Sequence, residues 1–287
     1  MTDNSELQSI RPEVLTTDDV LEMVPRLQGH RKLVNRLMRW LKLDQINEVH
    51  RVACNTPGPR CATRLLSEAL NIKVEVSGAE VLDRLPEGAF ITVSNHPLGA
   101  LDGIALVSLI GERRPDFKVM VNMILNRVGG MAPNFIAVDP MAQKDPAKRA
   151  VSINGIRQCI AQIRGGHPLG FFPAGAMSKT TWRRGNIQDR PWQDSVLQLI
   201  YKSKVPVIPV YFGDRNSRLC NIMGHICWPV RSIMLPREVI RKKNSTLHVV
   251  VGEPITVDQQ ESYRESPESL GAFLRERTYA LKNALRK

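Results

Sequence analysis

The chain has 287 residues, 43% of them hydrophobic, so it can bury a sizeable core in one large domain or two small ones without stabilising disulfides. Lysine and arginine number 40 against 28 acidic residues, and the net charge of +12 favours acidic partners such as nucleic acid, an anionic membrane or an acidic carrier protein. Aromatic residues make up only 5% and do not alternate with basic clusters, which argues against nucleic acid.

Cysteine usage and the N-terminal residues indicate the cell compartment. The number of cysteines is odd, and the first residues contain neither a basic start nor an apolar signal core, so we expect a reducing, cytoplasmic setting. Cys220, His225 and Cys227 lack the second pair of ligands that a tetrahedral metal site needs, so we expect buried thiols and no metal. No apolar run approaches the ~20 residues that span a bilayer, so any membrane contact is expected at the surface.

The first 70 residues are expected to be mainly helical. Residues 1–16 form a polar lead, Thr17 to Asp19 supply a cap and an acidic first turn for a short helix, and Pro25 should end or kink it. Further helices are expected over residues 30–44 and 58–70. The first of these sets basic residues against an apolar stripe of Leu33, Val34, Leu37, Met38, Trp40 and Leu41. This pattern fits a helix at a membrane interface and also a surface helix packed on the domain, because one stripe serves either purpose.

From residue 71 onward, strand-like and helix-like segments alternate as they do in a mostly parallel sheet flanked by helices. The expected strands are residues 73–76, 89–94, 117–121, 135–138, 169–172, 205–210 and 247–251. The expected helices are residues 101–110, 147–164, 194–202 and a terminal helix begun by Ser266 and Pro267; in the second, Ile153, Ile156, Ile160 and Ile163 fall on one face. We therefore predict an α/β fold, with a helical N-terminal segment over residues 1–70 and an α/β domain over residues 71–287.

A histidine and an aspartate follow the expected strand 89–94, in the segment Ser-Asn-His-Pro-Leu-Gly-Ala-Leu-Asp-Gly of residues 94–103. Parallel α/β proteins place their chemistry at the carboxyl ends of strands. A neutral imidazole, which ordinarily titrates near pH ~6.5, can accept a proton from a hydroxyl if an acceptor holds its other nitrogen. His96 is therefore a candidate base and Asp102 its orienting partner. The alternative is structural, with His96 bonded to local backbone and Asp102 favoured by a helix N-terminus.

A second turn leaves the expected strand 169–172, in the segment Gly-Phe-Phe-Pro-Ala-Gly-Ala-Met-Ser of residues 170–178. Two such turns at one edge of a sheet would face each other. Downstream lie four cations that could hold an anionic group near the base: Lys179, Arg183, Arg184 and Arg190. Each of them could equally be a solvated loop charge of a basic protein.

Together these blocks resemble the glycerolipid (lysophosphatidate-type) acyltransferase superfamily. The resemblance is carried by the strand of residues 205–210, by Asn95-His96-Pro97 with Asp102, and by the turn Phe172-Pro173-Ala174-Gly175. Residues 189–192, 213–217 and 235–238 narrow it to the bacterial hemolysin branch, which includes the O-acyltransferases of ornithine-lipid and glycine-lipid synthesis. The likeness spans roughly residues 74–255, and the two turn blocks together are specific where each alone is not.

The resemblance implies a mechanism without a covalent acyl-enzyme. The histidine would take the proton of the acceptor hydroxyl, which attacks an acyl thioester on coenzyme A or acyl carrier protein, while the aspartate orients the histidine. His96 and Asp102 would be the catalytic residues, nearby donors would stabilise the oxyanion, and no cofactor beyond the acyl-ACP or acyl-CoA co-substrate is expected. The candidate substrate-binding residues are Asn95, Gly99, Phe172, Pro173, Gly175, Ser178, Lys179, Arg183, Arg184 and Arg190.

Departures from the commonest family pattern bear on the acceptor. Five residues instead of four separate His96 from Asp102, and Gly99 can absorb the extra residue as a turn. Where glycerol-phosphate acyltransferases have Phe-Pro-Glu-Gly, this chain has Ala174, and Asp139 stands in the earlier block where an arginine is expected. Both changes weaken a phosphate-bearing acceptor and favour a lyso-aminolipid with a carboxylate head, for which one cation suffices.

We therefore expect a peripheral membrane O-acyltransferase on the cytoplasmic, inner face of the cell membrane, which acylates the hydroxyl of an N-(3-hydroxyacyl) glycine or ornithine. Its partners would be acyl carrier protein or coenzyme A, the lyso-lipid acceptor and an anionic membrane surface, with no nucleic acid. Two alternatives are a lysophosphatidic acid acyltransferase of phospholipid synthesis and a non-catalytic, membrane-associated protein with a lipid-binding groove.

Overall fold

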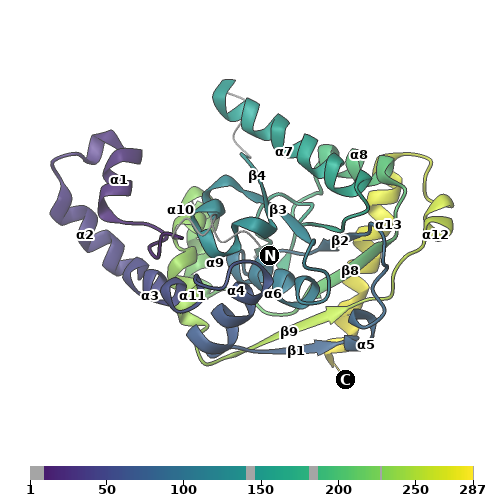
Figure 1. Cartoon of the computed structure of the whole chain (residues 1–287), viewed down its shortest axis with the longest axis horizontal. Helices are drawn as coiled ribbons and strands as arrows, with labels where there is room; N and C mark the ends of the chain where they lie inside the picture. Colours follow the sequence, from purple (N-terminus) through teal and green to yellow (C-terminus); the bar gives the residue numbers. More distant parts are fainter. Residues whose placement is uncertain (1–9, 140–145, 181–186, 227, 287) are drawn as a thin grey trace, which may run out of the picture.

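The computed structural model describes residues 10–139, 146–180, 187–226 and 228–286, and its centre is a sheet with helices on both faces (Figure 1). Within these residues seven strands form the sheet in the order β1-β9-β8-β2-β5-β3-β4, and every neighbouring pair is parallel except β8 with β9. The strands are β1 (Lys73–Ser77), β2 (Ile91–Ser94), β3 (Lys118–Asn122), β4 (Phe135–Val138), β5 (Leu169–Phe171), β8 (Val207–Phe212) and β9 (Thr246–Val251). The predicted α/β class with a mostly parallel sheet is confirmed.

The middle of the sheet brings three strand ends together. β2 lies between β5 and β8, with Val93 paired to Phe171 on one side and Ser94 paired to Val210 on the other. These strands are buried along their whole length, because helices cover both faces, and this explains their continuous apolar runs. The turns that follow β2 and β5 therefore leave the sheet side by side, as the sequence predicted.

Two groups of helices cover the two faces of the sheet. One face carries α3 (Leu43–Ala53), α4 (Pro59–Arg64), α6 (Ala100–Gly111) and α11 (Leu235–Arg241), and the other carries α7 (Pro146–Arg164), α8 (Asp194–Ser203) and α13 (Pro267–Ala280). α6 is apolar almost all round and is packed between the sheet and α4, where a Cβ on Gly111 would lie 2.7 Å from the Pro59 ring. The helix that follows the β2 turn is thus part of the core.

The remaining elements are short and lie in the connections. They include the helices α5 (Ala79–Leu82), α9 (Arg218–Ile226), α10 (Trp228–Ile233) and α12 (Val257–Glu261). The 3₁₀ helices are η1 (Pro25–Leu27), η3 (Met123–Arg127), η4 (Gly129–Asn134) and η6 (Leu281–Arg286), and η2 (Leu65–Ala69) is a π-helix. A hairpin is formed by β6 (Lys179–Thr180) and β7 (Ile187–Gln188). α4 and η2 together occupy the helix expected over residues 58–70. The sequence did not predict the hairpin or the helices α3, α5, α9, α10, α11 and α12.

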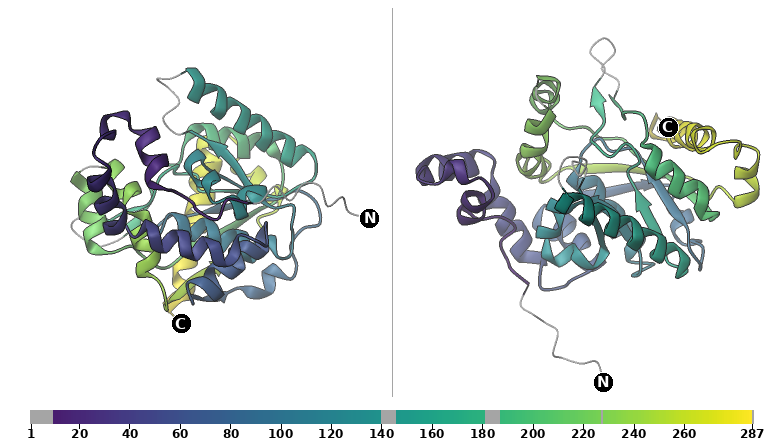
Figure 2. Two further views of the ribbon diagram at one scale, coloured as in Figure 1. Left: turned by 60° about the vertical axis from the view of Figure 1, so that its left-hand side comes forward. Right: turned by 90° about the horizontal axis from the view of Figure 1, so that it is seen from above.

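The first two helices, α1 (Thr17–Met23) and α2 (Arg31–Trp40), project from one side of the body (Figure 2). Thr16 caps α1, rather than Thr17, because the Thr16 side chain accepts the Asp19 N–H at 3.3 Å while the Asp19 carboxylate accepts the Thr16 N–H at 2.6 Å. α1 ends at Met23, two residues before Pro25, as predicted.

The helix expected over residues 30–44 is divided at its end. α2 stops at Trp40, and Lys42 adopts a left-handed φ of 59° before α3 begins. Val34, Met38, Leu41 and Leu43 form a small core of their own, partly against α1. Leu33, Leu37 and Trp40 remain exposed. Part of the apolar stripe therefore packs on the protein, and part faces outward.

The prediction that the four isoleucines of α7 form its packed face is wrong for three of them. Ile163 is buried, but exposed fractions of 44, 39 and 38% are found for Ile153, Ile156 and Ile160. The helix contacts β4 through smaller residues instead, since Cys159 is fully buried and a Cβ on Gly155 would lie 2.4 Å from the Ala137 carbonyl oxygen. Because α7 approaches β4 closely on the side of Gly155 and Cys159, its isoleucines point toward solvent.

Candidate active site

The turn after β2 brings a histidine and an aspartate together at the sheet edge. Asp102 lies in the first turn of α6, and its Oδ2 is 3.1 Å from His96 Nδ1. The same Oδ2 accepts the backbone N–H groups of Leu98 and Gly99 at 2.8 and 3.0 Å. One carboxylate therefore organises both the turn and the histidine ring.

Burial separates the two members of this pair. Asp102 is completely buried, whereas the His96 side chain is 19% exposed. Burial raises the pKa of Asp102, against the His96 ring and the two backbone N–H groups, which favour the carboxylate. Nδ1 and Oδ2 are close, but their geometry is not that of a hydrogen bond, and Nδ1 has no hydrogen-bond partner among the described residues. Nε2, on the far side of the ring, is the nitrogen available to a substrate hydroxyl.

Gly99 lies between the two residues and has a backbone that only glycine adopts readily. Its φ is +78°, and a Cβ there would lie 2.6 Å from Leu235 Cδ2 and 2.9 Å from Met177 Sδ. Gly99 is one of the five residues between His96 and Asp102, and its positive φ lets the chain turn within this segment. Lack of space and backbone conformation together require glycine at this point.

The turn after β5 packs directly on the histidine. The Phe172 ring stacks on the imidazole of His96, with centroids 4.1 Å apart and planes inclined by 30°, and it is 6.3 Å from the ring of Phe212 at the end of β8. Gly175, at φ +62°, donates its N–H to the Phe172 carbonyl at 2.9 Å, and the Pro173 carbonyl accepts a backbone N–H from the residue before α8 at 2.8 Å. The stacked ring limits how far the imidazole can rotate.

A buried serine and aspartate hold the main chain of His96. The His96 N–H lies 3.2 Å from both Ser178 Oγ and Asp189 Oδ1, and the Ser178 N–H donates to the His96 carbonyl at 2.8 Å. The Ser178 hydroxyl donates to Asp189, whose backbone N–H donates to the Tyr279 hydroxyl at 2.7 Å. Burial raises the pKa of Asp189, although the Ser178 and His96 hydrogen bonds favour its charged form. Sequence reasoning did not assign a role to Asp189.

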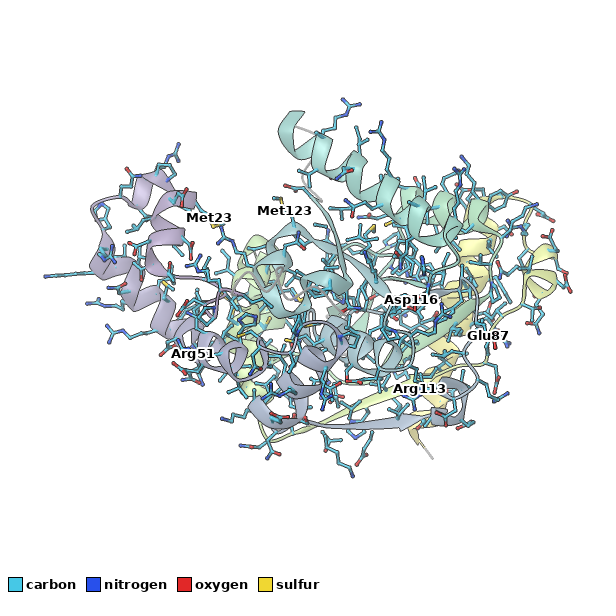
Figure 3. The ribbon with its side chains drawn as sticks, viewed as in Figure 1. Met23, Arg51, Glu87, Arg113, Asp116 and Met123 are labelled. Carbon is cyan, nitrogen blue, oxygen red and sulfur yellow. The ribbon has the colours of Figure 1, made fainter. Side chains whose placement is uncertain are left out.

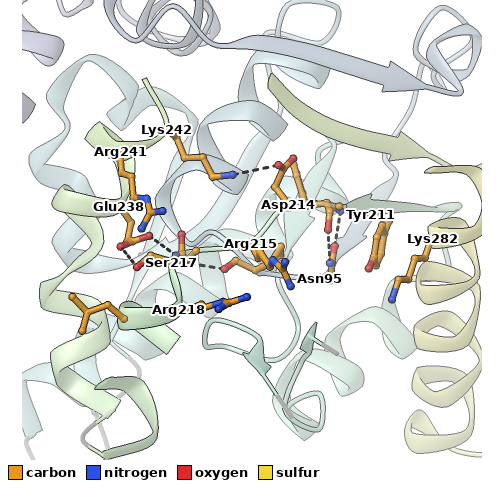
Figure 4. A pocket seen from close by; sticks show the side chains of 15 residues that line it. Asn95, Tyr211, Asp214, Arg215, Ser217, Arg218, Glu238, Arg241, Lys242 and Lys282 are labelled. Carbon is orange, nitrogen blue, oxygen red and sulfur yellow. Dashed lines mark hydrogen bonds and ion pairs between the residues drawn. The ribbon is translucent and has the colours of Figure 1, made fainter. Parts of the chain in front are cut away.

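Asn95 joins the same turn to β8. Its side chain is 2% exposed; Nδ2 donates to the Phe212 carbonyl at 2.9 Å, and Oδ1 accepts the Phe212 N–H at 2.7 Å (Figure 4). These two bonds extend the contact between β2 and β8 beyond the last paired residues. The His96 turn is therefore held from both neighbouring strands.

The cations expected near the base are placed unevenly. Lys179 is exposed at the start of β6 and forms no ion pair with a described residue. Arg190 is half-buried, and its charge lies close enough to lower the pKa of Arg231. Arg183 and Arg184 lie outside the described residues. The structure thus brings Asn95, Gly99, Phe172 and Ser178 around His96.

A buried arginine that the sequence analysis did not select lies beside the second turn. Arg231 is 7% exposed, and its guanidinium donates to the Met177 carbonyl at 3.3 Å and to Asn221 Oδ1 at 3.1 Å. Burial lowers its pKa from the usual high value. The available signal was an arginine in the largely apolar hexapeptide Trp-Pro-Val-Arg-Ser-Ile of residues 228–233.

The described residues contain no group of three or more His, Cys, Asp and Glu side chains that could hold a metal ion. Cys220 is a buried free thiol. The side chain of His225 and the whole of Cys227 lie outside the part of the chain that the structure describes.

Two turns, one with a histidine and an aspartate and the other with a stacked phenylalanine, meet at the end of a mostly parallel sheet. A family model described as acyltransferase matches residues 20–287. The chain belongs to the acyltransferase family. This acyltransferase is 31% identical over 196 residues to a lyso-glycine lipid O-acyltransferase of Bacteroides thetaiotaomicron, a match that covers 66% of this chain and 68% of that protein. A second lyso-glycine lipid O-acyltransferase, of Phocaeicola vulgatus, is 27% identical over 225 residues, with 75% of each chain covered.

The fold of the acyltransferase is also similar to a solved structure. The 1-acyl-sn-glycerophosphate (LPA) acyltransferase PlsC of Thermotoga maritima superposes with a TM-score of 0.50 at 14% identity, over 94% of each chain. This likeness shows the fold alone. The family and the curated relatives show that the protein is an acyltransferase enzyme of lipid biosynthesis, which confirms the predicted family and the interpretation as an enzyme. No helix in the described part of the chain is long and apolar enough to span a membrane.

Proposed function

We propose that this acyltransferase moves a fatty acyl group from a thioester of acyl carrier protein or coenzyme A to the hydroxyl of a lyso-aminolipid, an N-(3-hydroxyacyl) glycine or ornithine. The observation that carries the proposal is the His96 ring, of which one nitrogen lies 3.1 Å from a buried carboxylate and the other is left for a substrate. Relatives that are 31 and 27% identical bear the name lyso-glycine lipid O-acyltransferase, which supports this class of acceptor.

In the proposed reaction His96 is the base and Asp102 holds its ring. Nε2 takes the proton of the acceptor hydroxyl while the oxygen attacks the thioester carbonyl carbon, so that a C–O bond forms. The tetrahedral oxyanion then collapses, the C–S bond breaks, and the proton passes from Nε2 to the departing thiolate. Asp102 stabilises the imidazolium between these two steps. The products are an ester and a free thiol, and no acyl group is attached to the protein.

Ala174, at the position where glycerol-phosphate acyltransferases carry glutamate, is evidence for an acceptor without phosphate. Ala174 is 4% exposed and belongs to an apolar cluster with Phe171 and Trp192, so this position supplies no charge to a head group. Asp139, in the block where an arginine is expected, supplies a charge of the wrong sign. A carboxylate head carries one charge, and an exposed cation such as Lys179 is sufficient for it.

The outer side of α2 supports a place at a membrane surface. Exposed fractions of 55, 41 and 48% are found for Leu33, Leu37 and Trp40, and the same helix exposes Lys32, Arg36 and Arg39. Such apolar side chains can enter the headgroup layer while the cations attract anionic lipids.

Two further segments also expose methionines. Met23 on α1 and Met123 on η3 are 51 and 42% exposed (Figure 3). Arg127 of η3 lies 3.5 Å from Asp19 of α1, so the two segments are in contact. We infer that the enzyme is peripheral, on the inner face of the cell membrane.

The acceptor is tested by offering the purified enzyme one acyl donor at a time together with N-(3-hydroxyacyl) glycine, N-(3-hydroxyacyl) ornithine or lysophosphatidic acid. We expect the mass of the O-acyl ester to appear with at least one of the two amino acid lipids. Turnover of lysophosphatidic acid without turnover of either amino acid lipid would overturn the proposal in favour of phospholipid synthesis.

The membrane surface is tested by flotation with vesicles that contain anionic lipid. Replacing Leu33, Leu37 and Trp40 together by serine should lower the bound fraction severalfold, while Leu41 is left in place because it is buried. The matched control replaces Ile153, Ile156 and Ile160 on α7 by serine, because these are also large apolar side chains exposed on a helix. Equal binding by the α2 variant, or an equal loss in the control, would contradict the assignment to α2.

A further inference from the structure

A pocket of about 920 Å³ lies beside the histidine turn, at the carboxyl end of β8 (Figure 4). Asn95 and Pro97, the two chain neighbours of His96, form part of its wall. The connection from β8 to α9, the helix α11 and the C-terminal turn η6 form the rest. The pocket therefore shares a wall with the turn that carries the proposed base.

Several cations of this pocket form no ion pair with any carboxylate that the structure describes. The two acidic side chains of the lining are already engaged, since Asp214 pairs with Lys242 at 3.3 Å, and Glu238 accepts the N–H and the O–H of Ser217 at 2.7 and 2.6 Å. No ion pair with a described residue is formed by the four remaining cations, which are Arg215, Arg218, Arg241 and Lys282. Three separate segments of the chain supply them, and tertiary folding brings them to one cavity.

The charge and lining of the pocket indicate a ligand with phosphate groups. Unpaired cations that converge on one cavity repel one another, and a bound polyanion relieves this repulsion. The planar guanidinium groups of arginine match phosphate oxygens with paired N–H donors. The lining consists mainly of polar and charged side chains, so it offers no channel for a fatty chain. Its volume lies near the upper end of the ~300–1,000 Å³ typical of small-molecule sites.

We propose that this pocket binds the phosphate groups of the acyl donor, a phosphopantetheine thioester, and thereby presents the thioester end of the donor to His96. The inference rests on the proposed function, in which the acceptor head carries a single carboxylate and would leave most of these cations unused. Phosphopantetheine carries a phosphate in either donor, whether it is part of coenzyme A or attached to acyl carrier protein. Coenzyme A adds further phosphates, which suit a pocket with four unpaired cations.

Binding is tested first without any acceptor, so that the result does not depend on turnover. Coenzyme A is titrated calorimetrically into the wild-type enzyme, into the double variant Arg218→Gln with Arg241→Gln, and into the single variant Arg215→Gln. We expect at least tenfold weaker binding in the double variant, a smaller loss in the single variant, and a loss of affinity with added salt. The control is Arg157→Gln on α7, an exposed arginine outside the pocket, and it should bind as the wild type does.

Separate assays with acyl-CoA and with acyl-ACP distinguish the two sources of phosphopantetheine, and competition then tests the role of the phosphate. Free 4′-phosphopantetheine should inhibit transfer from acyl-CoA or from acyl-ACP, whichever donor the enzyme uses, whereas pantetheine without phosphate should not. The double variant should raise the KM for that donor and leave the KM for the acceptor unchanged. Equal inhibition by pantetheine, or a raised KM for the acceptor alone, would overturn the inference and leave the proposed function standing. If the enzyme bound coenzyme A normally but transferred no acyl group to any acceptor, the proposed function would be overturned and this inference would stand.

Discussion

Two histidine–carboxylate pairs in this enzyme differ in the way that matters for chemistry. His96 and Asp102 lie 3.1 Å apart, with side chains 19 and 0% exposed, whereas His167 and Asp116 are closer, at 2.8 Å, but 50 and 31% exposed. The first pair follows β2, at the carboxyl ends of the strands. The second pair precedes β5 and β3, at their amino ends, which is the edge where open α/β sheets do not place their ligands.

The electrostatics of the two carboxylates also differ in sign. Burial raises the pKa of Asp102. Burial acts in the same direction on Asp116, but Arg114 and His167 outweigh it and hold the pKa of that carboxyl below its usual range. A short distance between histidine and carboxylate is therefore a poor guide to function. The strand end and the burial of the carboxylate distinguish the two pairs.

The strongest test of this comparison removes each histidine in turn. His96→Ala should lower the rate of acyl transfer on the order of 1,000-fold, because general base catalysis contributes roughly 10²–10⁴-fold. His167→Ala should leave the rate within about twofold. Both are measured as steady-state ester formation, with circular dichroism to verify folding. Equal losses in the two variants would remove the distinction between the pairs.

Asp102→Asn should lower kcat on the order of 100-fold, because an amide does not stabilise the imidazolium. Its stability, compared with that of the wild type, should instead increase with pH. A carboxyl whose pKa is raised on folding contributes stability that is complete below the ordinary value of about 4 and is lost as pH rises through the raised value. The Tm of the variant should therefore gain on that of the wild type as pH rises from 4 to 8. A variant whose Tm falls relative to that of the wild type with rising pH would contradict the raised pKa.

Gly99→Ala tests the turn that joins the pair. The new methyl group would meet Leu235 and Met177 at a φ of +78°, so we expect a loss of about 1–3 kcal/mol in the free energy of unfolding, measured in urea, together with reduced transfer. Gly166→Ala is the matched control, since its φ is +84° and nothing lies within 4 Å of the added Cβ. The control separates backbone strain from the steric contact.

Asp116→Asn should have the smallest effect. A partly exposed ion pair contributes about 1 kcal/mol, so stability at neutral pH should fall slightly and acyl transfer should not change. Because the pKa of Asp116 is lowered on folding, this contribution exists above pH ~4 and is lost as pH falls through the lowered value. The difference in Tm from the wild type should therefore disappear in acid.

The sheet could be predicted closely because each strand is a local apolar run between turn residues. The strand expected at 135–138 has the bounds of β4, and the others agree within two residues at each end. The face of α7 could not be predicted in this way, since Gly155 and Cys159 make the close contact with β4 and the larger isoleucines do not. Periodicity identifies an apolar stripe but does not show which side of it has room to approach a sheet.

The sequence by itself determined the meeting of His96 with Asp102, because a short turn into a helix leaves these side chains few ways to be far apart. Only the tertiary structure decided that Asp189, 93 positions away, accepts the His96 N–H, and that cations from α9, α11 and η6 converge beside the same turn. Such contacts depend on the strand order, which places β8 and β5 on either side of β2. Strand order follows from the burial of the whole core, and no local segment of the chain encodes it.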